Sequence, residues 1–122
     1  MRLLGLLALL STQSALAGLT PAELDCVAKS TYFEARSKPP RDWEKTASVA
    51  VKRKQVYSKK QRFGAKSSNL CDIVTSKEYT TNIKLPIKEK EVYKEIKKVL
   101  SASSFPYNYL YFNHTKHTST YR

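Results

Sequence analysis

The 122-residue sequence lacks any apolar run of about 20 residues, the length that a membrane-spanning helix needs. Its most apolar stretch comes first, where a single arginine is followed by an apolar core at 3–10 and a small-residue end at 15–17. This three-part pattern is typical of a secretory signal peptide. We therefore expect residues 1–17 to be cleaved after Ala17, which leaves an exported domain, periplasmic or extracellular, at 18–122. Retention of the first segment as a membrane anchor is the alternative.

Cysteine and histidine are scarce, with two of each. His114 and His117 stand at the C-terminal end without a second cluster of ligands, so we expect no metal and no cofactor. In an exported domain, the even pair Cys26 and Cys71 predicts a disulfide, which closes a loop of about 45 residues and contributes about 4 kcal/mol. Two buried free thiols are the alternative. The sequence also lacks a G-x-S-x-G motif, a P-loop and a dinucleotide fingerprint.

Acidic residues are absent between Glu44 and Asp72, although the whole chain has a net charge of +12. The basic residues of this interval are Lys45, Lys52, Arg53, Lys54, Lys59, Lys60, Arg62 and Lys66. Such a segment attracts polyanions. Because the export signal points away from nucleic acid, we expect no nucleic-acid partner. We expect instead that 45–66 contacts anionic polymers of the cell envelope, unless it is only a solvated helix face and loop.

Helical patterns occupy most of the exported part. Thr20, Pro21 and Glu23 form a capping box at the start of a helix predicted over 21–36. This helix is apolar on two faces, which is typical of a central helix packed by neighbours on both sides. Further helices are expected at 40–57, 70–74 and 86–103.

Two other segments predict strands. Residues 78–85 are rich in β-favouring types, and 107–114 alternate strictly between two faces. No repeat and no domain linker is visible. The sequence therefore predicts one α+β domain, mostly α, with a small β hairpin, and we expect it to be a monomer.

One carboxylate, Glu34, follows two aromatic residues on the rim of the first helix's apolar stripe. Desolvation disfavours an ionised carboxyl group, and a carboxyl group that keeps its proton can act as a general acid. The alternative from composition is a structural salt bridge to Arg36. The other acids stand in polar, charge-paired segments, and only Glu78, beside Tyr79, shares an aromatic context.

Five short motifs follow one another along the chain: D-C-V-A at 25–28, Y-F-E-A-R at 32–36, V-A-V-K-R at 49–53, L-C-D-I-V at 70–74 and Y-L-Y-F-N-H at 109–114. This order resembles the spore-cortex-lytic-enzyme type of bacterial and phage cell wall hydrolases, over most of the exported part. Four departures are visible, one of them at the end of the chain, where the family's P-S-W is only S-T-Y-R at 119–122. The family's Gly-Glu after E-A-R is Ser37-Lys38, its Asn before Arg53 is Lys52, and its Gln before the later aromatic is Glu78.

The resemblance implies a lysozyme-like lytic transglycosylase fold acting on peptidoglycan glycan strands, in phage lysis or wall remodelling. One catalytic acid, Glu34, would protonate the oxygen that links N-acetylmuramic acid to N-acetylglucosamine and then accept the muramoyl 6-hydroxyl proton, giving a 1,6-anhydro end. The expected substrate-binding residues are Arg36, Glu78, Tyr79, Tyr111 and Asn113. A hydrolytic muramidase with Glu78 as second carboxylate, and a non-enzymatic cationic protein that binds the envelope, are the alternatives.

Overall fold

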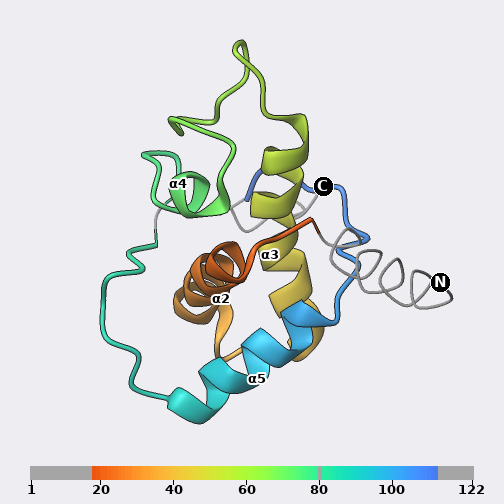
Figure 1. The fold of residues 1–122 in the computed structure, drawn as a ribbon. Helices are drawn as coiled ribbons and strands as arrows, with labels where there is room; N and C mark the ends of the chain where they lie inside the picture. Colours follow the sequence, from red (N-terminus) through yellow and green to blue (C-terminus); the bar gives the residue numbers. More distant parts are fainter. Residues whose placement is uncertain (1–17, 80, 113–122) are drawn as a thin grey trace, which may run out of the picture.

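The structure, a computed structural model, describes residues 18–79 and 81–112. Within these ranges the chain is mostly helical, with helices α2 (Pro21–Ala35), α3 (Pro40–Val56), α4 (Leu70–Val74) and α5 (Lys90–Ser101). Helix α2 lies at the centre, and α3, α4 and α5 each pack against it (Figure 1). None of the helices in this part of the chain is long and apolar enough to cross a membrane.

The central place of α2 follows from its two apolar faces, as the sequence predicted. Val27 and Ala28 are fully buried in α2. The core is completed from the three other helices by Val49, Ala50, Leu70, Ile73, Val74, Ile96 and Leu100. The predicted capping box begins the helix: the Glu23 amide donates to Thr20 Oγ1, and the Thr20 amide donates to Glu23 Oε1, both at 3.1 Å.

Glu23 does more than cap α2, because its carboxylate joins three helices. It is 2% exposed, and its Oε2 accepts hydrogen bonds of 2.9 Å from Lys54 Nζ of α3 and from the Leu70 amide at the start of α4. Burial by itself raises the pKa of Glu23. The hydrogen bond from Lys54, with those from the Leu70 and Thr20 amides, outweighs burial and holds the pKa below its ordinary value.

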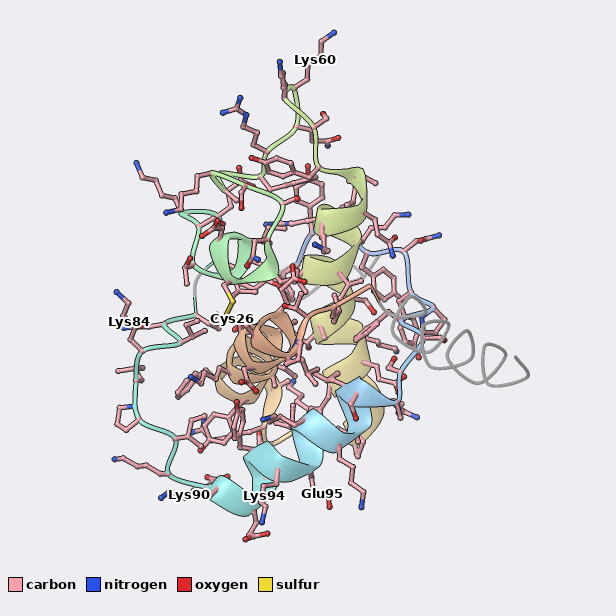
Figure 2. All side chains as sticks on the ribbon, viewed as in Figure 1. Cys26, Lys60, Lys84, Lys90, Lys94 and Glu95 are labelled. Carbon is pink, nitrogen blue, oxygen red and sulfur yellow. A yellow bond between two sulfur atoms is a disulfide. The ribbon has the colours of Figure 1, made fainter. Side chains whose placement is uncertain are left out.

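A disulfide between Cys26 and Cys71 ties α4 to the middle of α2, with their Cα atoms 5.2 Å apart (Figure 2). The pairing is the one that the sequence predicted. Helix α4 has only five residues, and its N-cap, Asn69, accepts a hydrogen bond of 2.8 Å from the Cys71 amide. So short a helix is not stable alone, and its position therefore depends on the disulfide, on the Glu23 bond and on burial of Leu70 and Ile73.

The expected β hairpin is absent from residues 18–79 and 81–112, where pairing is limited to an isolated bridge between Ser58 and Gln61. A strand needs a partner with free backbone groups. Residues 107–112 lie along α3, whose backbone groups are already bonded within the helix. They contact side chains of α3 instead; for example, Arg53 Nε donates a hydrogen bond of 2.8 Å to the Leu110 carbonyl. The fold is therefore mostly α, without the predicted strands.

The segment between α4 and α5 also differs from expectation, because α5 begins at Lys90 and not at Pro86. Residues 81–89 run as an irregular stretch along one side of the molecule (Figure 1). Asn82 turns the chain by accepting a hydrogen bond from the Lys84 amide at 3.0 Å. The Glu89 amide then donates to Tyr32 Oη of α2 at 2.9 Å. This contact with α2 holds the residues that the sequence predicted as the first turn of a helix.

Candidate functional site

The C-terminal turn of α2 is held rigidly. The Trp43 indole Nε1 of α3 donates to the Ala35 carbonyl at 2.8 Å, and both residues are buried. The Arg36 amide donates to the Tyr32 carbonyl at 3.1 Å, and Pro39 and Pro40 then begin the next helix. A side chain on this last turn is therefore carried by a fixed backbone.

Glu34 is on that turn and lines a cleft of about 780 Å³ between the end of α2 and the 81–89 segment. The cleft is lined by Tyr32, Phe33, Glu34, Arg36, Thr81, Asn82, Leu85, Pro86, Lys88 and Glu89. The lining combines apolar surface with amide and charged groups, the mixture found where a polar ligand is bound and oriented.

Glu34 is half-buried, and its carboxylate makes no hydrogen bond or ion pair with any residue that the structure describes. Tyr32 and Phe33, which precede it, form an edge-to-face pair with ring centroids 5.0 Å apart. The salt bridge from Glu34 to Arg36, the alternative suggested by composition, is not formed: Arg36 Nε lies 3.4 Å from Glu89 Oε2. Glu34 is thus an acid held at a cleft without a structural partner.

Arg36 and Glu89 also line the cleft. The Arg36 guanidinium lies over the Tyr32 ring, 5.2 Å from its centroid, and pairs with Glu89. The side chains of the pair are 43% and 54% exposed, so solvent screens the ion pair and the side chains remain accessible to a ligand. Arg36, a predicted substrate-binding residue, is therefore in the same cleft as Glu34.

Sequence reasoning missed the wall of the cleft that the 81–89 segment forms, with Glu89, Thr81 and Asn82 among its residues. Glu89 stands in a lysine-rich stretch and was interpreted as an ordinary surface acid. Its place in the cleft depends on the return of the 81–89 segment to α2 through the Tyr32 hydroxyl, a contact between residues 57 positions apart. No local pattern in the sequence signals that contact.

The other predicted binding residues lie elsewhere. Glu78 and Tyr111 line a separate pocket beside the 58–64 turn. Tyr79 is only 7% exposed and packs in the core, where its ring lies 5.5 Å from the Arg53 guanidinium, so it presents no open face to a sugar. Asn113 lies outside the described residues. Glu78, the expected second carboxylate of a hydrolase, is therefore not a member of the cleft that Glu34 lines.

A buried guanidinium stands beneath that second pocket. Arg53 is 2% exposed, and its guanidinium carbon lies 5.1, 5.5 and 5.2 Å from the ring centroids of Phe63, Tyr79 and Tyr111. Such an aromatic cage stabilises a cation through the faces of the rings. Glu78 Oε1 is 4.0 Å from Arg53 Nη1, within ion-pair range but too far for a hydrogen bond.

Neither a metal centre among the described residues nor a matched relative accounts for this cleft. In the described ranges, no three His, Cys, Asp or Glu side chains gather closely enough to hold a metal ion; His114 and His117 lie outside those ranges. No protein-family model, curated protein or solved structure matches the chain. The chemistry must therefore be argued from the cleft itself.

Proposed function

We propose that the protein is an exported peptidoglycan lytic transglycosylase with Glu34 as its single catalytic acid and base. The observation that carries the proposal is the Glu34 carboxyl group, which is half-buried at the edge of a cleft, fixed on the end of a central helix, and without a partner among the described residues. The structural carboxylate of Glu23 is bonded through both oxygens, whereas a general acid must be free to meet the substrate, as Glu34 is at its cleft.

The proposed reaction has two steps. Glu34, protonated, gives its proton to the glycosidic oxygen between N-acetylmuramic acid and N-acetylglucosamine, and the bond breaks through an oxocarbenium-like state. The Glu34 carboxylate then takes the proton of the muramoyl 6-hydroxyl group, whose oxygen closes on C1. The product carries a 1,6-anhydro end, and Glu34 is protonated again. No water is consumed and no second carboxylate is needed.

The cleft offers groups that suit a glycan. The half-buried Phe33 and the exposed side chains of Asn82 and Leu85 lie on its walls. An amide group such as that of Asn82 can bind acetamido groups and sugar hydroxyls, and apolar surface can contact the faces of the sugar rings. These residues support a carbohydrate substrate for the Glu34 acid.

A hydrolytic muramidase is the second candidate, and one observation favours it. Glycoside hydrolysis uses a second carboxylate about 5 to 9.5 Å from the acid. Glu78 lines a different pocket, but Glu89 lines the same cleft as Glu34. A hydrolase would therefore use Glu89, and its products would carry ordinary reducing ends.

The test is Glu34→Gln assayed on purified peptidoglycan, with Glu95→Gln as control. Loss of a general acid lowers the rate about 10²- to 10⁴-fold, and the amide keeps the shape of the side chain, so we expect a folded, inactive variant. Glu95 is exposed on α5 (Figure 2), away from the cleft lining, and its variant should lyse normally. A folded Glu34→Gln protein with full lytic activity refutes the role of Glu34, whereas a parent protein that does not lyse peptidoglycan leaves a cationic envelope-binding protein.

A further inference from the structure

A second built pocket lies beside the 58–64 turn, apart from the Glu34 cleft. Its volume is about 420 Å³, and it is lined by Lys59, Lys60, Gln61, Arg62, Phe63, Gly64, Glu78 and Tyr111. We name this cavity the basic pocket. Two backbone hydrogen bonds of 3.1 Å between Ser58 and Gln61 close the turn that bears Lys59 and Lys60, and Lys60 stands at the extremity of the molecule (Figure 2).

Positive charge in the basic pocket is largely uncompensated. Lys59, Lys60 and Arg62 are exposed, and none of them forms an ion pair within residues 18–79 and 81–112. The one acidic residue of the lining is Glu78. Glu78 packs closely against Gly64, where an added Cβ would lie 3.1 Å from Glu78 Cγ. The φ of Gly64, +77°, also suits glycine.

Arg53 adds a fourth positive charge immediately behind the lining. Three of its neighbours, Phe63, Tyr111 and Glu78, are lining residues, and the Arg53 guanidinium lies 4.0 to 5.2 Å from them. Arg53 is only 2% exposed, and its Nη1 finds no hydrogen-bond partner in the described part of the chain. A buried charge is screened less than an exposed one. Arg53 therefore reinforces the positive potential that an entering anion meets.

The basic pocket and the Glu34 cleft are joined by a short run of chain. Glu78 lines the pocket, and Thr81 and Asn82 line the cleft. Three peptide units separate the Cα atoms of residues 78 and 81 by at most about 11 Å. Tyr111, which is 52% exposed, presents an aromatic ring at the pocket. Residues 78 and 81, one from each site, are therefore within a span that a polymer with repeated groups can cover.

From this geometry we infer that the basic pocket binds carboxylates of the peptide stems on the same peptidoglycan strand whose glycan enters the cleft. The inference rests on the proposed function for the identity of the polymer. Lysine and arginine donate charge-assisted hydrogen bonds to carboxylates, which are stronger than neutral ones. The closeness of the two sites favours groups carried by one strand over a separate phosphodiester polymer of the envelope.

The test compares two triple variants of equal charge change in binding to insoluble peptidoglycan. Lys59→Ala/Lys60→Ala/Arg62→Ala removes the exposed cations of the basic pocket. The control, Lys90→Ala/Lys94→Ala/Lys98→Ala, removes three exposed cations of α5 (Figure 2 shows Lys60 and Lys90 at opposite ends). We expect the pocket variant to bind at least tenfold more weakly and with less dependence on salt, and the control to bind as the parent does.

Further arms identify the ligand. On strands whose peptide stems have been removed, the parent should bind as weakly as the pocket variant; removal of phosphodiester polymers from the wall should change nothing. Equal losses in the two variants, full binding to stripped strands, binding that follows the phosphodiester polymer, or no binding by the parent each overturn the inference. Because Glu34→Gln should bind like the parent, binding separates this inference from the lytic reaction, which can fail independently.

Discussion

At the N-terminal end of α2 the Glu23 carboxylate is 2% exposed and accepts hydrogen bonds from two backbone amides and a lysine. At the C-terminal end of the same helix, Glu34 is half-buried at a cleft and has no partner among the described residues. Both glutamates are held on the same rigid helix. They differ in what surrounds the carboxylate, and the two environments suit opposite roles.

The two environments distinguish a structural acid from the proposed catalytic acid. A buried carboxylate that accepts several hydrogen bonds is stabilised in its ionised form, so it cannot serve as a proton donor near neutral pH. A carboxylate that the fold leaves unbonded contributes little to stability and stays available to a ligand. Substitutions at the N-terminal end of α2 should therefore change the stability of the protein, and those at the C-terminal end should change its activity.

The largest stability effect should come from the disulfide beside Glu23. We expect Cys26→Ser/Cys71→Ser to lower the free energy of unfolding by about 4 kcal/mol, because the unfolded chain loses the closure of a loop between residues 45 positions apart. Denaturant unfolding measures the loss, and reduction of the parent protein should reproduce it. A double variant as stable as the parent would show that α4 is held by packing and Glu23 alone.

Glu23→Gln should follow, with a loss of about 1.5 to 3 kcal/mol, the range for hydrogen bonds to charged groups. The amide keeps the shape of the side chain, but it leaves Lys54 without its ion-pair partner and replaces an acceptor of the Thr20, Leu70 and Lys54 bonds. Glu95→Gln, on the exposed side of α5, is the matched control and should unfold like the parent. Equal stability of Glu23→Gln and the parent would contradict the structural role.

The same carboxylate sets a dependence on pH. The folded pKa of Glu23 lies below the ordinary value of 4.5. Its contribution to stability is therefore complete above about pH 4.5 and is lost as the pH falls through the folded pKa. We expect the parent to lose more stability than Glu23→Gln on acidification below pH 4.5, measured by denaturant unfolding at several pH values. Parallel curves for the two proteins would exclude Glu23 as the titrating group.

The residues around Glu23 and those around Glu34 also differ in how well the sequence predicts them. The capping box of Thr20 and Glu23 and the bounds of α2, α3 and α4 follow local rules, and the structure confirms them. The Lys54 bond to Glu23 does not, because it joins residues 31 positions apart.

At the other end of α2, the sequence singles out Glu34 but cannot supply the opposite wall of its cleft. That wall forms when 81–89, predicted as strand and helix, returns to α2 through Tyr32. Local β propensity and alternation predicted strands at 78–85 and 107–114. Propensity describes how a residue fits a sheet, and no partner strand forms in the described ranges. Contacts distant in sequence therefore decide which residues face Glu34.

The smallest effect on stability should come from Glu89→Gln, which tests whether Glu34 acts without a second carboxylate. The Arg36–Glu89 pair is about half exposed, so its loss should change stability by at most about 1 kcal/mol. In the transglycosylase, intramolecular closure needs no second carboxylate. The Glu89→Gln rate should then fall only slightly, as Arg36 loses its partner, and the fragments should still be lighter by one water than hydrolytic ones.

In a hydrolase, Glu89→Gln should be as inactive as Glu34→Gln, and the parent products should contain the added water. Mass measurement of digested peptidoglycan separates the outcomes, because product mass reports the chemistry even where the rate does not.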